Sequence, residues 1–512
     1  MGESRVHKSF LNAKVNLVFY FITLFVSFFS RKVFLDCLGA DFMGLAGTVG
    51  NLLSFLNMAE LGIGSSIGYV LYKPIFEKDR EKINDVISVL GYLYRIVGTI
   101  ILCSGIILSF FLPLIFKDVS IDISVIYFVY YSFLIGTLFG YFVNYRYTLF
   151  GADQRNYLVT AYFQTANIIK TLIQMGLAYY TKNYYLWAII ELSFGILYCF
   201  ILNWKTNQVY PWLKTSYRTG KLKRKEYDII LVKARQLFVH QIGSLGRYKV
   251  LPFLIYAYSS LSAVAYYANY TLIVDKVNAI LNNVLNSTGA GVGNMIAEGD
   301  KDKIMDVYWQ LTSLRYFLSG VLVFGLYHLI EPFVSTWLGP EYIMGKPVLI
   351  LILINTFIVQ VRGTNDQFIY GYGLFADTWA PIVTFVLTIG AAVLCGMKWG
   401  LAGVLAGDTI SGLLIIYIWK PYYLFSSGFK LSVIGYWKEI IKYLSILFMA
   451  WIGVGWLLDR ILINPYTGYL GWLVYACVSV LLFLIVYGLM NYAFCSGFRK
   501  IVFRFSREKG VK

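Results

Sequence analysis

The stretch Ser30–Lys73 reads SRKVFLDCLGADFMGLAGTVGNLLSFLNMAELGIGSSIGYVLYK and joins two apolar segments. Arg31 and Lys32 end the first segment, and the turn residue Gly39 precedes the second. The second segment carries four polar side chains among apolar ones: Asn51, Ser54, Asn57 and Glu60. Polar side chains inside a membrane are costly and are tolerated where a helix faces protein or water. The stretch therefore predicts two membrane helices that pack within a larger helical assembly.

The composition of the whole chain is that of a membrane protein. Apolar residues make up 58% and charged residues 14% of the 512 residues, and the mean hydropathy is +0.65. A soluble domain has roughly 25% charged residues. A membrane helix needs roughly 20 apolar residues, so a chain of this length accommodates about 14 of them with short loops. We therefore predict an all-α polytopic membrane protein with about 14 transmembrane helices.

The apolar segments give the positions of these predicted spans. They lie at about 15–36, 44–70, 88–112, 123–145, 158–180, 184–204, 236–258, 264–290, 308–331, 346–370, 379–397, 400–419, 440–458 and 468–492. The first span follows a basic start and has no small-residue cleavage site after it. We therefore expect it to be an uncleaved membrane helix and not a signal peptide.

The distribution of basic residues predicts how the spans are oriented. If successive connections alternate between the two sides, 30 of the 44 Lys and Arg residues lie on the side of both termini and 7 on the other side. Basic residues accumulate on the cytoplasmic side of membrane proteins. We therefore predict a multi-pass protein with both termini in the cytoplasm. The net charge of +17 is then mainly topology signal and attraction to anionic lipid, and nothing favours nucleic-acid binding.

An internal repeat divides the chain into similar parts. KPIFEKDREKI ends at Ile83 and AEGDKDKI ends at Ile304, 221 residues later, and each follows an even-numbered span. The Ala-Asp pair ending at Asp153 returns at Asp377, 224 residues later. Parallel halves with a site between them are a transporter architecture. We therefore predict a six-helix bundle at 1–215, a second at 216–425 related to it as a repeat, and two additional helices with a basic cytoplasmic tail at 426–512.

Helical periodicity places polar side chains on one face of spans 1, 2, 7 and 8, which are equivalent in the repeat. This predicts a polar cavity between the halves. The candidates on or beside these faces are Arg31 and Lys32 in span 1, Asn51 and Asn57 in span 2, His240 and Arg247 in span 7, and Asp275, Lys276, Asn282 and Asn286 in span 8. On an ideal helix Glu60 falls off the polar face of span 2.

Alternative roles exist for each kind of candidate. Asn and Ser also join membrane helices by hydrogen bonds, and Arg31 and Lys32 can extend to the outer interface. Asp275 and Lys276 can neutralise each other or their neighbours. A mid-span charge such as Arg247 more often marks a transport pathway. The six cysteines have no paired spacing, so we predict free thiols, with no metal site and no disulfide.

The motifs of the first third resemble those of a known family. Arg31–Leu45, the segment NMAELGIG at 57–64, Tyr72-Lys73-Pro74 and the loop GADQR at 151–155 are similar to bacterial polysaccharide transporters of the Wzx type. These are the O-antigen and exopolysaccharide flippases of the MATE-like MOP transporter superfamily. The resemblance covers most of the chain in layout and is motif-specific mainly over residues 30–85. At 246–249 the sequence GRYK departs from the more neutral polar segment expected in the family.

The resemblance implies a flippase of the bacterial inner membrane, taking part in polysaccharide or lipopolysaccharide biosynthesis. It would move undecaprenyl-pyrophosphate-linked oligosaccharide units to the outer leaflet by alternating access, with membrane lipids and other polysaccharide assembly proteins as partners. The diphosphate of such a cargo requires cationic side chains. The expected substrate-binding set is therefore Arg247, Arg31, Lys276, Lys32, Asn51, Asn57, His240, Asn282 and Asn286. No cofactor is expected, and Glu60 and Asp275 are the candidates for coupling to H⁺ or Na⁺.

Three other functions compete with this prediction. A MATE-type multidrug exporter shares the fold, but exporters of cationic drugs are expected to use acidic cavity residues, and seven Lys and Arg residues fall within the spans here. A lipid II flippase is the closest of the three to this prediction, and the sequence alone does not exclude it. A membrane polysaccharide polymerase or ligase would need a large outer loop for its catalytic groups. The predicted outer loops are short, so we expect a transporter and not an enzyme.

Overall fold

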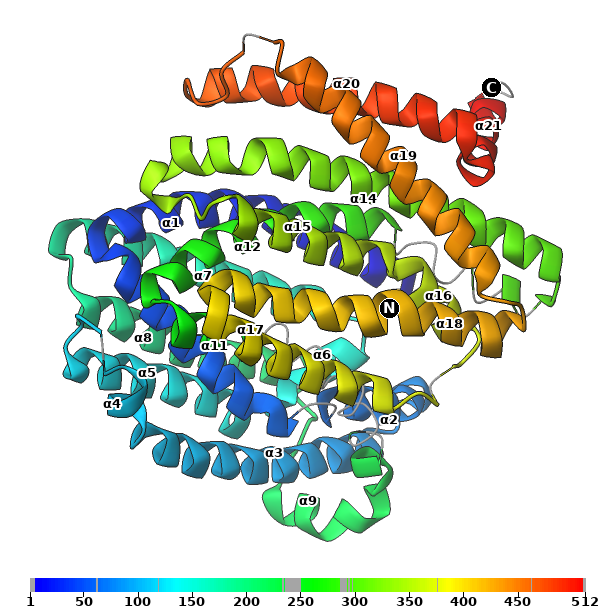
Figure 1. Cartoon of the computed structure of the whole chain (residues 1–512). Helices are drawn as coiled ribbons and strands as arrows, with labels where there is room; N and C mark the ends of the chain where they lie inside the picture. The colour runs from blue at the N-terminus through cyan, green and yellow to red at the C-terminus, as the bar shows by residue number, and fades with distance from the viewer. Residues whose placement is uncertain are drawn as a thin grey trace. The chain divides into compact units, whose positions relative to one another are not determined.

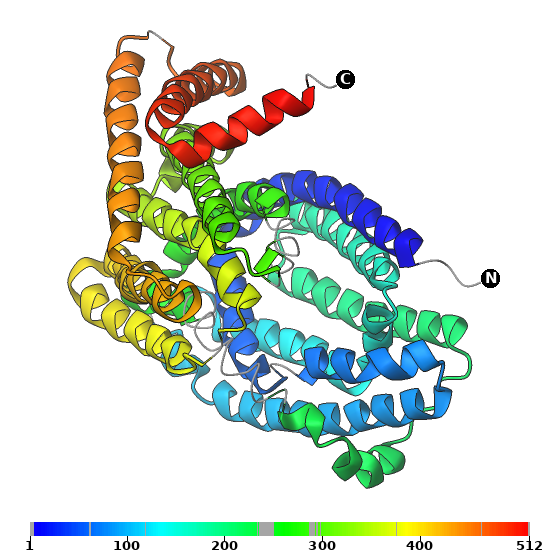
Figure 2. The same ribbon diagram turned by 90° about the vertical axis from the view of Figure 1, so that its right-hand side faces the viewer.

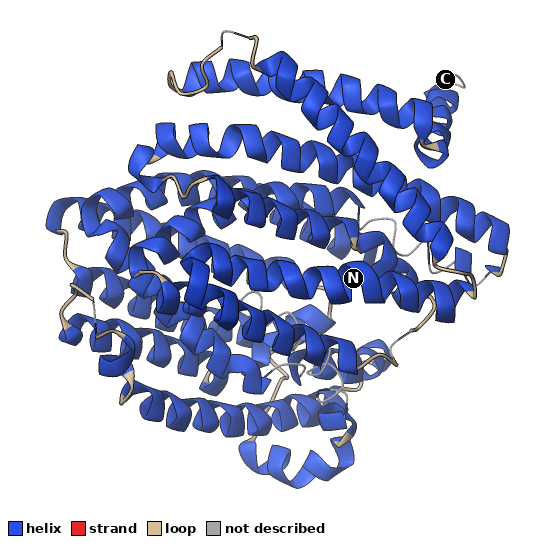
Figure 3. Ribbon diagram, viewed as in Figure 1, coloured by secondary structure: helices blue, strands red, loops and turns tan. Residues whose placement is uncertain are grey.

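The computed structural model describes residues 5–60, 63–117, 119–232, 234, 250–285, 292, 295–296, 298–374, 376–461 and 463–509. Within these ranges every regular element is a helix, as Figure 3 shows. The predicted all-α fold class is thus confirmed. The chain divides into two compact units, Met1–Ala265 and Tyr266–Lys512. The predicted domain boundaries at residues 215 and 425 do not coincide with this division. They stay a prediction.

Unit 1 is built from membrane helices joined by short helical turns (Figure 1). Its elements are α1 (Arg5–Leu56), η1 (Asn57–Glu60), α2 (Ile63–Glu77), α3 (Arg80–Ser109), α4 (Leu112–Ile115), α5 (Ile123–Phe142), η2 (Tyr145–Tyr147), α6 (Thr148–Ala152), α7 (Asn156–Thr181), α8 (Tyr184–Val209), α9 (Tyr217–Lys223), η3 (Arg224–Tyr227) and α11 (Leu251–Tyr258). Helix α12 (Leu261–Leu285) starts in unit 1 and continues into unit 2.

Unit 2 contains the remaining long helices. Its elements are α14 (Lys301–Trp337), η6 (Pro340–Tyr342), α15 (Lys346–Val361), α16 (Gly363–Gly371), α17 (Trp379–Ser411), the π-helical segment η7 (Gly412–Trp419), α18 (Lys420–Tyr423), the π-helical segment η8 (Leu424–Phe429), α19 (Ile434–Leu458), α20 (Tyr469–Phe494) and α21 (Ser496–Lys509). Figure 2 shows the end of the chain, in red, as a separate short helix after α20.

The number of membrane spans agrees with the prediction. Among the described residues, nine helices are long and apolar enough to cross a membrane. Two of these contain two spans each, because α1 bends at Gly39 and α17 bends at Gly400. Helices α7, with 26 residues, and α12, with 25 residues, are also long enough to span. The remaining predicted span, 236–258, lies mostly outside the described residues, so the count is consistent with about fourteen.

The second span is not the continuous helix expected from the sequence. The second arm of α1 ends at Leu56, the 3₁₀ turn η1 follows at Asn57–Glu60, and α2 begins at Ile63. In a 3₁₀ turn the side chains of residues i and i+3 eclipse each other. Asn57 and Glu60 therefore lie on the same side of the chain. The prediction that Glu60 falls off the polar face of span 2 assumed α-helical rotation throughout the span, and η1 interrupts that rotation.

Helix α17 is a tight hairpin of two spans. At Gly400 the backbone takes φ 53°, in the left-handed region that favours glycine, and the chain turns back on itself. The two arms then approach so closely that a Cβ on Gly407 would overlap the backbone of Ala392, and a Cβ on Gly403 would overlap the backbone of Cys395. Small residues allow this approach in membrane helices. The predicted span 379–397 is the first arm of α17, and the predicted span 400–419 is its second arm continued by η7.

The internal repeat is visible in matching capping contacts. The Asp79 side chain accepts a hydrogen bond from the Lys82 backbone N–H (3.0 Å) and caps α3. The Asp300 side chain accepts one from the Lys303 N–H (3.1 Å) and caps α14, at the predicted offset of 221 residues. A carboxylate at a helix N-terminus satisfies a free backbone N–H and favours the helix dipole.

The second repeated motif also keeps its role. Asp153 accepts a hydrogen bond from the Tyr210 hydroxyl (2.8 Å) at the end of α8, which closes the sixth span. Asp377 pairs with Lys420 (2.7 Å) and accepts a hydrogen bond from Trp419 (3.3 Å), at the end of the twelfth span. Each aspartate thus holds the last span of its own half.

The final pair of helices packs on α14 inside unit 2. The rings of Phe324 on α14 and Phe483 on α20 stack with centroids 3.8 Å apart, and Tyr316 packs against Tyr443 of α19 at 5.4 Å. Helix α21 then returns to α14, where Lys500 pairs with Asp306 (2.5 Å). The two additional helices predicted near 440–458 and 468–492 are confirmed as α19 and α20.

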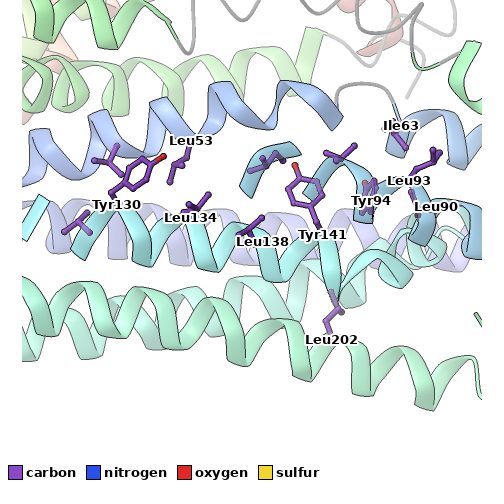
Figure 4. Close-up of a cluster of buried hydrophobic side chains, with 14 of the residues drawn as sticks. Leu53, Ile63, Leu90, Leu93, Tyr94, Tyr130, Leu134, Leu138, Tyr141 and Leu202 are labelled. Atoms are coloured by element: carbon purple, nitrogen blue, oxygen red, sulfur yellow. The ribbon is translucent and has the colours of Figure 1, made fainter. Parts of the chain in front are cut away.

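The core of unit 1 is mostly apolar and includes several buried tyrosines. Figure 4 shows buried leucine and isoleucine side chains of this core, with Tyr94 of α3 and Tyr141 of α5 among them. The two rings meet edge to face with centroids 5.4 Å apart. A buried tyrosine usually has a hydrogen-bond partner for its hydroxyl. Both hydroxyls bond to the carboxylate of Glu60, which is the centre of the candidate site.

Candidate functional site

A cavity of about 750 Å³ lies inside unit 1. Residues of α1, η1, α3, α5, η2, α7 and α8 line it. The polar side chains on its wall are Ser54, Asn57, Glu60, Tyr94, Ser132, Thr137, Tyr141, Asn144, Tyr147, Glu191 and Tyr198. A Cβ added at Gly136 or Gly140 on the same wall would meet no atom within 4 Å, so these glycines face open space. The cavity is therefore bounded by membrane helices, and its wall carries both polar and apolar side chains.

Glu60 is held on this wall by two tyrosines. The Tyr94 hydroxyl donates a hydrogen bond to Oε1 of Glu60, and the Tyr141 hydroxyl donates one to Oε2 (2.9 Å). Hydrogen bonds to an ionised carboxylate are stronger than those between neutral groups. Both carboxylate oxygens therefore act as acceptors. Glu60 lies in η1, where the helix is broken, within hydrogen-bond distance of the two phenols.

Glu191 is the second carboxylate on the wall, and it has a different environment. Lys170 of α7 pairs with its Oε1 (2.7 Å), and the Gln174 side chain donates to its Oε2 (3.0 Å). The lysine side chain is 16% and the glutamate side chain 29% exposed, so the pair is largely shielded from solvent. The ion pair neutralises Glu191. Among the described ion pairs none includes Glu60, whose partners are the neutral phenols.

Two residues of the cavity wall have a buried amide oxygen without a hydrogen-bond partner in the part of the chain that the structure describes: Oδ1 of Asn57 and Oδ1 of Asn144. Asn144 follows the end of α5 and precedes η2, but its side chain makes no capping bond, and the residue is only 4% exposed. A buried acceptor left unpaired costs about 1–3 kcal/mol.

The structure separates the predicted polar residues of span 2. Asn57 and Glu60 lie on the polar cavity, as described above. Asn51 instead lines a second, mostly apolar pocket of about 510 Å³, together with Phe55, Phe111 and other apolar side chains of unit 1. Asn51 thus lines a different pocket from Ser54, although both residues lie on the second arm of α1.

Arg31 and Lys32 have local partners in unit 1. The Arg31 guanidinium donates a hydrogen bond to the backbone carbonyl of Ala265 (2.7 Å) near the start of α12. Lys32 pairs with Asp36 one helical turn later (3.5 Å), and both side chains are about half exposed. Such an exposed pair contributes little to stability. Neither residue lines the cavity of about 750 Å³.

The candidates on α12 are not gathered at that cavity. Asp275 is exposed and Asn282 is half-buried. The neighbouring Asn278 accepts a hydrogen bond from Gln360 of α15 (2.9 Å), so this polar stripe joins two helices of unit 2, the alternative role noted from the sequence. The Lys276 side chain also interacts with a neighbouring group. His240, Arg247 and Asn286 lie outside the described residues.

The other intramembrane cations predicted from the sequence also have partners. Arg95 lies over the ring of Tyr217 (4.7 Å), and Arg362 pairs with Asp366 (2.8 Å). Arg315 is only 3% exposed and donates to the Gln360 carbonyl (3.3 Å). The contacts of Arg95 and Arg315 each join two helices of one unit, whereas the Arg362 pair lies within one turn of α16.

Sequence reasoning missed most of the residues around Glu60. Tyr94, Tyr141 and Asn144 drew no attention because tyrosine is abundant here, with 43 copies, and Asn144 stands at a span end. The signal that could have found two of them is the sequence YFVN at 141–144, in which a tyrosine and an asparagine are three residues apart and share a helical face.

The comparisons with known proteins find the fold and no sequence family. No protein-family model matches the chain, and no curated protein matches it at significant similarity. A solved structure of the lipid II flippase MurJ, in an inward closed conformation, is similar with a TM-score of 0.63 and 14% identity, over 95% of this chain and 99% of that chain.

Two structures of multidrug resistance MATE family transporters of the MOP superfamily are also similar. The inward-facing one has a TM-score of 0.60 and 15% identity, over 82% of this chain and 99% of that chain. The outward-facing one has a TM-score of 0.51 and 13% identity, over 82% and 96%. At such identities the likeness concerns the fold. This multi-pass, all-α chain therefore has the fold that the lipid II flippase and the MATE transporters of the MOP superfamily share.

Proposed function

We propose that this protein is a flippase, which moves a lipid-linked glycan headgroup across the bacterial inner membrane by alternating access. The observation that carries the proposal is the match over nearly the whole chain to a lipid II flippase. The Wzx-type motifs of residues 30–85 favour an undecaprenyl-pyrophosphate-linked oligosaccharide as the cargo. A passage for such a polar headgroup requires polar groups inside the membrane.

The length of the match separates the flippase from the MATE transporters. The flippase structure covers 95% of this chain and the MATE structures 82%. The difference is about 65 residues, the length of two membrane helices with their loop. The chain has such a pair in α19 and α20, at Ile434–Leu458 and Tyr469–Phe494. The additional pair supports cargo with a long lipid tail, for which helices beside a central bundle offer apolar surface.

The cavity of unit 1 is assigned to a coupling ion and not to the diphosphate. Its wall carries Glu60, which has no cationic partner among the described ion pairs, and a carboxylate repels an anionic headgroup. The diphosphate is assigned to the cationic candidates Arg31, Arg247 and Lys276, of which arginine binds phosphate in a bidentate manner. In this proposal the acidic groups bind the coupling ion and the basic groups bind the cargo.

A multidrug exporter is the second candidate, and one observation favours it. The acidic cavity, with Glu60 on its wall, has the charge expected of a site for a cationic drug. Lipid-linked cargo and drug export differ in what accumulates when the protein is absent, so one experiment separates them.

Deletion of the gene is expected to remove surface polysaccharide without stopping glycan synthesis. The lipid-linked repeat unit should accumulate on the cytoplasmic face, because its synthesis precedes transport. Extraction of lipid-linked oligosaccharides and surface staining measure both effects, and expression of the intact chain in the deletion strain is the control. A strain that keeps its surface polysaccharide but becomes sensitive to cationic drugs would show the exporter instead. Failure to make the repeat unit at all would indicate an enzyme.

Reporter fusions are expected to place both the connector and the carboxyl terminus in the cytoplasm. Fusions after Lys225 in η3 and after Lys509 in α21 should read cytoplasmic, because basic residues concentrate in both segments. A fusion after Gly345, in the predicted outer loop between α14 and α15, should read periplasmic and serves as the control. A fusion at Lys225 or Lys509 that reports a periplasmic location would contradict the predicted orientation, in which both termini are cytoplasmic.

A further inference from the structure

We propose that α21 (Ser496–Lys509) lies along the membrane surface and binds anionic phospholipid headgroups through its basic residues, with Phe503 among the lipid chains. Helix α20 is long and apolar enough to cross a membrane, and only Cys495 separates it from α21. Figures 1 and 2 show α21, in red, running across the end of α20 and not continuing it. A helix that crosses the end of a membrane span lies along the membrane surface. This lipid is part of the surrounding bilayer, so the site does not depend on which cargo is transported.

Packing against α14 holds the first turn of α21 beside the membrane. A Cβ on Gly497 would lie 2.6 Å from the carbonyl oxygen of Trp309 and 2.9 Å from Oγ of Ser313, so glycine allows the two helices to approach closely. The Phe498 ring is buried and lies 4.7 Å from the ring of Phe317. These contacts fall in the N-terminal half of α14, which is itself long and apolar enough to cross a membrane. Helix α21 therefore begins at the membrane boundary and does not extend away into solvent.

Two basic residues fix the direction of α21. The Arg499 guanidinium donates hydrogen bonds to the carbonyls of Tyr492 (3.0 Å) and Ala493 (2.6 Å) in the last turn of α20. A basic side chain at a helix C-terminus satisfies free carbonyls and interacts favourably with the helix dipole. Lys500 pairs with Asp306 of α14. Arg499 and Lys500 thus hold α21 against two membrane helices, and both side chains are exposed.

The segment that follows α20 is strongly basic. Residues 496–512 include one acidic residue, Glu508, and six basic ones: Arg499, Lys500, Arg504, Arg507, Lys509 and Lys512. In the sequence, Lys500, Arg504 and Arg507 have the spacing typical of one helical face. Clusters of about four to eight Lys and Arg residues beside a membrane helix bind anionic lipids, and arginine binds phosphate oxygens in a bidentate manner. Anionic phospholipid headgroups therefore match the charge of this segment.

Apolar side chains of α21 are exposed beside the basic ones. Phe503 is 59% and Val502 38% exposed, whereas Phe498 of the same helix is buried. A bilayer surface accommodates such a helix, because its phosphates meet the basic residues and its hydrocarbon takes up the apolar ones. An acidic protein is the other class of partner. The bilayer is favoured over it because α21 directly follows a membrane span and so already lies beside lipid.

Hydrogen–deuterium exchange of the purified full-length protein in lipid nanodiscs tests the proposal. One set of nanodiscs contains phosphatidylcholine alone, and the other contains an equal mixture of phosphatidylcholine and phosphatidylglycerol. The backbone amides of α21 are expected to exchange about fivefold or more slowly with phosphatidylglycerol present, because each basic residue near an anionic surface stabilises the bound helix. High salt should remove the difference, since it screens charges at the surface.

A triple variant of α21, Arg504→Gln/Arg507→Gln/Lys509→Gln, is expected to lose most of this protection. The matched control removes the same charge from α9 and η3, and α21 should stay protected in it: Lys221→Gln/Arg224→Gln/Lys225→Gln. The exchange of the α14 amides reports whether unit 2 is folded, and it should be the same in every variant.

Phe503→Ser should also weaken the protection, because serine does not enter hydrocarbon, whereas Phe503→Leu should keep it. Equal exchange of wild-type α21 in the two bilayers would overturn the proposal, and it is the result expected if an acidic protein is the partner. Full protection in the triple variant of α21, or an equal loss in the variant of α9 and η3, would overturn the assignment of the lipid site to α21. Full protection in Phe503→Ser would overturn the insertion of Phe503 into lipid.

Discussion

Glu60→Gln is expected to abolish transport while the protein still folds and inserts. Glutamine has the size of glutamate and can still accept a hydrogen bond from Tyr94 or Tyr141. What it removes is the negative charge. A cation 4 Å from a carboxylate gains about 4 kcal/mol at an effective dielectric constant of 20, and even half of that energy is roughly 30-fold in affinity. Restoration of surface polysaccharide in the deletion strain measures the effect.

Two further substitutions make this result specific. Glu60→Asp keeps the charge on a shorter side chain and should restore transport in part. Glu226→Gln removes a carboxylate of similar size from the exposed η3 turn, where it pairs with Lys223, and should restore transport fully. Membrane-fraction levels of all three proteins must match. Full restoration of surface polysaccharide by Glu60→Gln would show that the charge at this position is not needed for transport.

Gly407→Val is expected to destabilise unit 2 severely. Its Cβ would overlap the backbone nitrogen of Ala392 and lie 2.7 Å from the Ala392 Cβ, on the opposite arm of the α17 hairpin. The arms cannot separate freely, because Gly403 meets the backbone of Cys395 and Thr388 bonds to Ser411 (2.6 Å) along the same contact. Inserting a side chain into packed structure costs about 1–3 kcal/mol where flexible neighbours can move, and more where they are backbone.

The thermal unfolding of the purified protein in detergent measures this effect. We expect the unfolding midpoint of Gly407→Val to fall by roughly 10 °C, or the protein not to accumulate at all. Gly390→Val is the matched control, since it adds the same side chain to the same helix at an exposed position where a Cβ meets no atom within 4 Å. Equal midpoints for the two variants would contradict the close approach of the two arms.

The sequence by itself determined the membrane helices and their repeat. Apolar length and composition are local properties, so α3, α5, α7, α8, α14, α19 and α20 lie where the spans were predicted. The caps at Asp79 and Asp300 were also readable, because a cap involves residues three apart in the chain. The bend at Gly39 followed from the turn residues, and its φ of 83° is one that glycine adopts readily.

Periodicity located part of the candidate site and misplaced the rest. Asn57 and Glu60 were recognised as polar residues in an apolar segment, which needs no knowledge of neighbours. The 3₁₀ turn that holds them was not predicted, because periodicity assumes an uninterrupted α-helix. Asn51 was assigned to the same face and lies in a different pocket.

Only the tertiary structure decided which carboxylate is neutralised. Glu60 and Glu191 look equivalent in the sequence, as single acids inside apolar helices. Packing places Lys170 against Glu191 and two phenols against Glu60. The physical reason is that apolar composition specifies which segments enter the membrane, whereas the rotation and approach of each helix depend on contacts with residues distant in the chain. The partners of a buried charge follow from those contacts.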